Sequence, residues 1–254
     1  MVKQTKKLST KTTVAQINAT DKFPITDANG VVSLVTLATI KAALLDGASF
    51  NAMYDGVFIM YHRKSDNLPL MVKPHKWTSI QSSGEIADGV VIVEGGKCLV
   101  VAPTEAASTL TWSSAAVSGG GTTTSDRVTA INDWAGRANT TSQIGHAECS
   151  SSSYAPGFCN AYSRSNANGQ GLTAGKWWLP SLGEMLMIYA NMTKINYALS
   201  LINGATQLQE AAYWTSTEYS ATYAWFLNLS NGYATGNTKA STTLRVRAVS
   251  AFIA

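Results

Sequence analysis

The chain has 254 residues, enough for one large domain or two smaller ones, and its 45% of hydrophobic residues can supply a core. Only 13% of the residues are charged, about half the usual share, so Ser, Thr, Asn and Gly must cover much of the surface, as is more typical of extracellular or virion proteins than of cytosolic enzymes. The net charge of +4 arises from four lysines among the first eleven residues. Because residues 12–254 are balanced, nucleic acid is not an expected partner.

The absence of long apolar runs and the cysteine count argue against several further classes of protein. No run of eighteen apolar residues occurs, so we expect no membrane insertion. The start, MVKQTKKLSTK, is basic but has no apolar segment after it, which argues against a secretory signal. Three cysteines do not make a disulfide framework. Cys149 and Cys159 flank a Ser- and Gly-rich loop, where they either pair or remain free, and Cys98 is expected as a small buried residue.

Residues 1–47 are predicted to form a Lys-rich tail and a small attachment or oligomerisation segment. A turn signal, DANG, separates a short extended piece from residues 32–45, which are predicted to form a short helix ended by Gly47. The apolar residues of this helix are Val35, Ile40, Ala43 and Leu44. The segment is too small to bury its own apolar surface, so we expect it to pack against copies of itself or against another protein.

Residues 48–84 are predicted to form a small β-hairpin region of their own, because DGVFIMYHR and LPLMVKPHKW are separated by the polar turn KSDN. Residues 85–254 are predicted to form the main domain. It begins with a second hairpin, in which EGGK joins two runs rich in β-branched residues.

One helix is predicted within residues 123–140. Ser125 or Asp126 can cap its N-terminus. Its apolar face consists of Val128, Ile131 and Trp134. Asn132 and Asp133 have the residue types of a metal-binding pair, but in this helical pattern they are expected on the solvated face.

A long loop and a second helix follow. Residues 139–175 are rich in Ser, Asn and Gly and are predicted to form a loop with local structure at most. The second helix begins after Ser181, which forms a capping box with Glu184. It extends through MLMIYANMTKINYALSLI and is predicted to break once near Thr193.

The end of the chain is predicted to be strand and turn. AYAWFLNLSNGYATGNT alternates around an Asn-Gly turn, which places two sets of residues on opposite faces. The core set is Trp225, Leu227 and Leu229, and the outer set is Phe226, Asn228 and Ser230. The closing strand also has two faces. One consists of Val246, Ala248 and Ser250, and the other of Arg245, Arg247 and Val249. The order of strands, helix, loop, helix and strands predicts an α+β fold in which the first and last strands pair.

No arrangement of residues indicates catalysis. His62, His75 and His146 are scattered, and His146 with Cys149 and Cys159 matches no common zinc spacing. GQGLTAGKW has the wrong glycine spacing for a phosphate-binding loop. We therefore expect a protein that is not an enzyme and that has neither a metal site nor a cofactor.

Three stretches, GKWWLPSLGEM, AAYWTSTEYSATYAWFLNLSNG and the final RVRAV, resemble the C-type lectin fold. More closely, residues 85–254 resemble the target proteins of diversity-generating retroelements. In that family an error-prone reverse transcriptase rewrites adenines near the end of the gene, so that Asn codons become many residue types while the scaffold stays fixed. The resemblance implies an α+β fold of two helices with antiparallel strands, bearing a solvent-facing variable region at about residues 219–244.

The resemblance implies a ligand-binding face on this variable region. Its expected residues are Tyr219, Ser220, Thr222, Tyr223, Phe226, Asn228, Ser230, Tyr233, Thr235, Asn237, Thr238, Ala240, Ser241, Thr242, Thr243 and Leu244. Tyr with Ser, Asn, Gly and Thr is also the chemistry of antibody paratopes. Trp225 and Lys239 are expected in the fixed scaffold, because randomised adenines in an Asn codon cannot give Trp or Lys.

Two related functions lack their motifs. The last proline is Pro180, so no Glu-Pro-Asn or Gln-Pro-Asp calcium motif follows the second helix. No cysteine follows Cys159, which disfavours a formylglycine-generating enzyme, a class that shares the fold.

The N-terminal DKFPITDANG and TIKAAL resemble the leading segments of phage tail-appendage proteins. This implies a virion protein attached to other tail proteins, a homotrimer, and a bacterial surface receptor that is a protein or a glycan. The alternatives are a cellular surface adhesin of the same fold and a non-variable structural tail protein.

Overall fold

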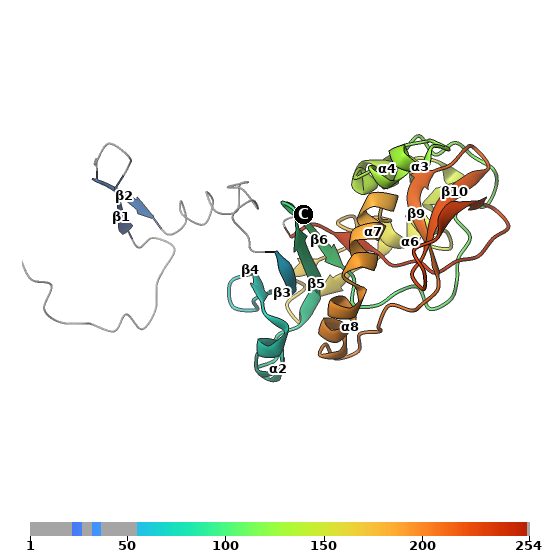
Figure 1. The fold of residues 1–254 in the computed structure, drawn as a ribbon. Helices are drawn as coiled ribbons and strands as arrows, with labels where there is room; N and C mark the ends of the chain where they lie inside the picture. Colours follow the sequence, from blue (N-terminus) through green and yellow to red (C-terminus); the bar gives the residue numbers. More distant parts are fainter. Residues whose placement is uncertain (1–21, 27–31, 37–54, 253–254) are drawn as a thin grey trace, which may run out of the picture. The chain divides into compact units, whose positions relative to one another are not determined.

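The computed structural model describes residues 22–26, 32–36 and 55–252, and the chain divides into two compact units, residues 1–50 and 51–254 (Figure 1). In the first unit, β1 (Lys22–Thr26) pairs with β2 (Val32–Thr36) in antiparallel fashion. The extended piece before the DANG turn is thus confirmed as β1. The helix predicted over residues 32–45 is wrong for its first five residues, because VSLVT pairs as a strand, and residues 37–47 lie outside the described part.

The second unit is built around a five-stranded antiparallel sheet of order β12-β6-β5-β3-β4. Its strands are β3 (Gly56–His62), β4 (Pro69–Val72), β5 (Ala87–Glu94), β6 (Lys97–Val101) and β12 (Val249–Ser250). The hairpin expected as a separate region over residues 48–84 belongs to this sheet, because β3 pairs along its length with β5. Apolar residues on both faces of β3 explain the difference, since a lone hairpin leaves them exposed.

The turn signal EGGK is borne out in this sheet, whereas the extended reading of LPLMVKPHKW is wrong at its end. Gly95 and Gly96 both have positive φ angles, 56° and 76°, and join Glu94 to Lys97 in a two-residue hairpin, as EGGK predicts. After β4, Pro74 begins helix α2 (Pro74–Ser82), so the end of LPLMVKPHKW is helical rather than extended.

The sheet separates two apolar cores, and β5 contributes to both. Val90 and Ile92 face the first core, which is covered by α2, α7 (Leu182–Ala190) and α8 (Met192–Ser200). Val91 and Val93 face the second core, which includes both Cys149 and Cys159. Figure 1 shows α7 between the large sheet and the strands β9 and β10, and its contacts with both strands agree.

The first predicted helix is in fact two short ones. Asp126 caps α3 (Arg127–Ile131), as one of the two predicted caps, but α3 ends at Asn132 and α4 (Gly136–Gln143) follows. The expected apolar face is wrong, because Val128 is 64% exposed and Trp134 39% exposed. Asp133, expected on the solvated face, is instead buried, and its hydrogen bonds end the helix there.

The predicted long loop, residues 139–175, begins within α4 and then contains four short elements: α5 (Ala147–Ser150), α6 (Ala155–Ala161), β7 (Arg164–Ser165) and β8 (Gly171–Leu172). Cys149 and Cys159 are free, buried thiols and Cys98 is half-buried. The second predicted helix is confirmed with its capping box of Ser181 and Glu184, and its predicted break lies at Asn191.

The last strands form a three-stranded antiparallel sheet of order β11-β10-β9. They are β9 (Ala212–Glu218), β10 (Tyr223–Asn228) and β11 (Ala234–Thr238). The final strand β12 returns to the large sheet but pairs with β6 rather than with the first strand. The two faces predicted for the closing strand agree with the packing, because Val246 and Ala248 lie in the second core and Val249 in the first. Arg247 is fully buried and donates to the carbonyl oxygens of Ala102 and Thr206.

The unit is therefore α+β, as the order of elements predicted. Within the described residues, no helix has the length and apolar character needed to cross a membrane.

Candidate functional site

The β10–β11 hairpin is the frame of the candidate site. Phe226 lies opposite Thr235 and Leu227 opposite Ala234, and the turn between the strands includes Gly232 at a φ of 72°. Asn228 organises the turn, since its Oδ1 accepts hydrogen bonds from both the N–H and the hydroxyl of Ser230, at 2.9 and 2.8 Å. The turn is thus held by its own polar side chains.

None of the sixteen predicted face residues is buried. Tyr223 and Tyr233 are the most exposed of its aromatic residues, at 41% and 56%. The buried residues between positions 219 and 244 are six others: Ala224, Trp225, Leu227, Leu229, Ala234 and Lys239. Trp225 and Lys239, expected in the scaffold, are therefore both interior.

The sixteen residues do not form one continuous strand face, which corrects the expectation. Side chains alternate along β10, and Tyr223 lies on the same side as Trp225, whereas Phe226 lies on the other. Tyr219 and Tyr223 pack together near Trp225, with ring centroids 6.3 Å apart. On the opposite side, the rings of Phe226 and Tyr233 are 6.2 Å apart. The hairpin therefore carries two aromatic groups, one on each side.

A glycine allows the first aromatic group to form. A Cβ atom at Gly236 would lie 2.7 Å from Cγ of Tyr219, closer than real contacts permit. The Tyr219 ring therefore lies directly over the backbone of β11. Because Tyr219 is also half-buried against the first core, it connects the exposed Tyr223 to the scaffold.

Two further predicted face residues pack against the core. Phe226 and Leu244 are half-buried and pack against the second core. Leu244 also exchanges backbone hydrogen bonds with Leu110, at 2.9 and 3.0 Å, so it belongs more to the scaffold than to the face. The expectation that Phe226 lies outside the core is wrong, because it faces buried Trp214 across the strand pair.

A hydroxyl cluster closes the far end of the hairpin. Oγ1 of Thr238 lies 2.7 Å from the hydroxyl of Ser241 and 2.8 Å from that of Thr242, which donates to Oδ1 of Asn237. Ala240, Ser241 and Thr243 remain exposed. The segment after β11 is thus ordered by short polar side chains.

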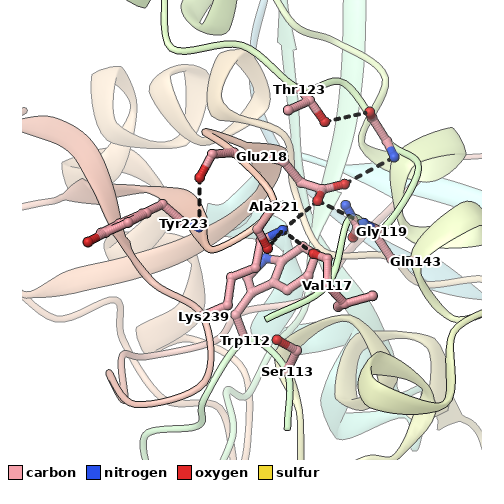
Figure 2. A network of polar contacts seen from close by, with 12 residues as sticks. Trp112, Ser113, Val117, Gly119, Thr123, Gln143, Glu218, Ala221, Tyr223 and Lys239 are labelled. Atoms are coloured by element: carbon pink, nitrogen blue, oxygen red, sulfur yellow. Dashed lines mark hydrogen bonds and ion pairs between the residues drawn. The ribbon is translucent and has the colours of Figure 1, made fainter. Parts of the chain in front are cut away.

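A buried ion pair holds both ends of the hairpin (Figure 2). Nζ of Lys239 lies 2.5 Å from Oε2 of Glu218, and both side chains are fully buried. The ammonium group also donates to the carbonyl oxygen of Val117 at 2.7 Å and lies 4.4 Å from the centre of the Trp112 ring. Burial lowers the pKa of Lys239, and its hydrogen bond to Glu218 opposes this shift. Glu218 ends β9 and Lys239 follows β11, so the pair spans the hairpin.

The carboxylate of Glu218 also binds a neighbouring loop. The backbone N–H groups of Gly119 and Gly121 donate to its two oxygens, at 2.8 and 3.1 Å. This network was not predicted from the sequence, although a signal was present. Glu218 and Lys239 are the only charged residues in the segment 211–244, and they flank the predicted hairpin.

Asp133 is a second buried acid with several hydrogen-bond partners. Oδ2 of Asp133 accepts from the hydroxyl of Thr217 at 2.7 Å and from Nδ2 of Asn139 at 2.9 Å. Its Oδ1 accepts from the N–H of Ala135 at 2.9 Å. Because all these partners are donors from the protein itself, Asp133 acts as a structural centre between β9 and α4.

Glu184, in the first turn of α7, is a third buried acid. Nε1 of Trp178 and the N–H of Ser181 donate to its Oε2, at 3.1 and 2.9 Å. Burial raises the pKa of Glu184 to about 7, and these hydrogen bonds oppose the shift. The folded protein thus holds a proton that the unfolded chain releases above its ordinary pKa of 4.5.

Replacing Glu184 with glutamine should flatten the pH dependence of stability. Stability from the protonated group is complete below about pH 4.5 and is lost as the pH rises through about 7. Glutamine retains an acceptor oxygen and has no proton to lose. Denaturant unfolding across this interval should show a smaller decline for Glu184→Gln than for the natural chain. Equal declines would contradict a raised pKa at this position.

The described residues contain no group of three or more His, Cys, Asp or Glu side chains arranged to hold a metal ion. The thiols are not reactive candidates either, since burial raises the pKa of both Cys98 and Cys149 to about 12. Comparisons with protein-family models, curated proteins and solved structures gave no match.

Proposed function

We propose that this chain is a receptor-binding protein with a C-type lectin-like fold that presents the β10–β11 hairpin and its flanking turns to a ligand on the bacterial surface. The proposal rests on how residues 219–244 divide into buried and solvent-accessible positions. Its six buried residues are scaffold, and none belongs to the sixteen predicted for the face. A segment divided in this way can change its exposed residues while keeping its packing.

The chemistry of the face suits adaptable recognition. The sixteen residues include no charged side chain, and four are aromatic. Tyr223 and Tyr233 are exposed anchors with few rotatable bonds, and the surrounding Ser, Thr and Asn residues offer hydrogen bonds. Such a surface accepts either a protein or a glycan receptor, and it avoids the desolvation cost of buried charges.

Rigidity supports the same proposal. A binding surface held in place before contact loses less entropy on binding. The Glu218–Lys239 pair ties both ends of the hairpin to the loop at Val117 and Gly119, and Asn228 holds its turn. The exposed residues therefore project from an ordered frame.

Assembly into a homotrimer on a phage tail, together with other tail proteins, is part of the proposal. It rests on the resemblance of the N-terminal segment and on the two-stranded form of β1–β2. A two-stranded hairpin is at best marginally stable alone in water. Joining copies would also raise the avidity of a weak variable site.

Changing Tyr233 to serine should weaken binding to bacterial cells by about tenfold or more, because truncating an aromatic anchor costs about 1.4 kcal/mol or more. Fluorescently labelled protein would be titrated against a panel of bacterial strains. Tyr197→Ser is the matched control, since Tyr197 is 54% exposed on α8, outside the hairpin.

The control should bind as the natural chain does. Equal weakening by both changes, or no effect of Tyr233→Ser on strains that the natural chain binds, would contradict the proposal. If the natural chain binds no strain of the panel, the non-variable structural tail protein is favoured. Imaging that finds the chain on the cell surface rather than on phage tails would favour a cellular adhesin.

A further inference from the structure

Trp134 is the exposed member of the seven tryptophans. The other six are at most 6% exposed, whereas Trp134 is 39% exposed. It lies after α3 and outside the segment 219–244, so neither the fold's core nor the proposed hairpin face accounts for it. An exposed indole of this size is a common feature of binding surfaces.

The backbone beside Trp134 is fixed before any ligand arrives. The carbonyl oxygen of Asp133 accepts from the N–H of Gly183 at 3.1 Å and from the hydroxyl of Ser181 at 2.7 Å. A Cβ atom at Gly183 would lie 2.4 Å from that carbonyl oxygen and 3.2 Å from the indole of Trp134. The close approach of this glycine thus seats the indole at the start of α7.

Trp134 forms a wall of two hollows. The smaller, of about 210 Å³, is lined by Lys97, Cys98, Leu99, Trp134, Glu184 and Met187. The larger and shallower, of about 650 Å³, is lined by Thr122, Val128, Thr129, Asn132, Asp133, Trp134 and Ala135. No residue of the segment 219–244 lines either hollow.

The smaller hollow combines an aromatic wall with donors and an acceptor. Nζ of Lys97 lies 4.3 Å from the centre of the Trp134 ring. Glu184 is 6% exposed, and its hydrogen bonds from Trp178 and Ser181 both end on Oε2. Within the described part of the chain, Oε1 of Glu184 therefore has no hydrogen-bond donor, although the residue lines the hollow.

The side chains of Trp134, Lys97 and Glu184 suit some classes of ligand better than others. An apolar ligand would offer no donor to Oε1 of Glu184 and no acceptor to the ammonium group of Lys97, at a desolvation cost. A cation would displace or repel the ammonium group of Lys97, and an anion would be repelled by the carboxylate of Glu184 above its raised pKa of about 7. A neutral polyhydroxyl ligand satisfies both groups, since its hydroxyls donate to the carboxyl and accept from the ammonium while its C–H face packs on the indole.

We propose that the hollow between Trp134, Lys97 and Glu184 binds a neutral sugar residue. Its volume lies below the range of about 300–1,000 Å³ typical of drug-sized ligands, which limits the occupant to a single ring. The rest of a longer glycan would extend over the shallow hollow beside Thr129 and Asn132. Because these residues lie outside the hairpin, this specificity stays constant while the hairpin varies.

The test uses the full chain labelled with ¹⁵N in its tryptophan indoles. Glucose, galactose, mannose and N-acetylglucosamine would each be added to about 50 mM, which covers millimolar dissociation constants. At least one sugar should shift the indole resonances of Trp134 and Trp178 in a saturable way. Trp178 is informative because its Nε1 donates to Glu184 on the floor of the hollow.

Two variants locate the bound sugar. Trp134→Ala should abolish the shift of Trp178, and Lys97→Met should weaken binding by about tenfold, as expected for a lost hydrogen bond to a charged group. Both positions are exposed, so both variants should fold. Tyr197→Ser should leave the titration unchanged.

The proposal is overturned if no sugar gives a saturable shift, or if the shift of Trp178 persists in Trp134→Ala. A shift removed by Tyr223→Ser but kept in Lys97→Met would place the sugar on the hairpin and would also contradict it. Failure here leaves the hairpin proposal intact, since the cell-binding test depends on Tyr233 and not on Trp134.

Discussion

Replacing Lys239 with methionine should lower the free energy of unfolding by about 3–5 kcal/mol, because it leaves the carboxylate of Glu218 buried without its cation. Both side chains are fully buried, and the ammonium group is 2.5 Å from the carboxylate. Methionine fills similar space beside Trp112 but supplies no donor for Glu218 or for the carbonyl oxygen of Val117. Denaturant unfolding monitored by tryptophan fluorescence measures the loss.

Two further variants separate charge from packing. Adding Glu218→Gln to Lys239→Met removes the unpaired charge, so the double variant should be more stable than Lys239→Met alone. Lys97→Met, at an exposed lysine, should change stability by no more than about 0.5 kcal/mol. If Lys239→Met also stays within that limit, the ion pair does not hold the hairpin.

Replacing Trp225 with alanine should cost about 3–5 kcal/mol of stability, the usual range for a truncated core aromatic. Trp225 is 3% exposed, packs in the first core, and donates its Nε1–H to the carbonyl oxygen of Thr124 at 2.7 Å. Alanine leaves a cavity and an unsatisfied carbonyl. Thermal or denaturant unfolding of the purified variant provides the measurement.

Tyr223→Ala is the matched comparison, because Tyr223 lies on the same side of β10 and is 41% exposed. It should cost much less stability than Trp225→Ala and should weaken ligand binding instead. Similar stability losses at the two positions would mean that the division between scaffold and face is wrong.

Signals confined to a few residues predicted the structure well. The capping box of Ser181 and Glu184, the EGGK hairpin and the alternation of Trp225, Leu227 and Leu229 each depend on neighbours in sequence, and the structure contains all three. Their energies come from local hydrogen bonds and from strand geometry, which the sequence determines directly.

Features set by distant contacts were not predictable in this way. The helix expected through Trp134 ends early because Asp133 binds Thr217, which is 84 residues away. The hairpin of β3 and β4 joins the main sheet because β5 covers its edge. The full burial of Arg247 depends on partners that are distant in sequence, namely Ala102, Glu105 and Thr206.

One error at the candidate site was avoidable from the sequence. Tyr223 and Trp225 are two residues apart in a strand, so they must lie on the same side, and Phe226 must lie on the other. Applying this rule to the whole hairpin predicts two aromatic groups rather than one face. The half-burial of Phe226 and Leu244 could not be predicted, because it depends on the second core beneath them.

The central claim is that residues 219–244 vary on a fixed scaffold. Deep sequencing of their codons across a population that carries the gene tests it most directly. Our account predicts substitutions clustered at the exposed positions, all explained by changed adenines in a nearby template copy, with the codons of Trp225 and Lys239 unchanged. A uniform sequence without a template copy, or substitutions spread equally over the six buried positions, would contradict a diversified binding face.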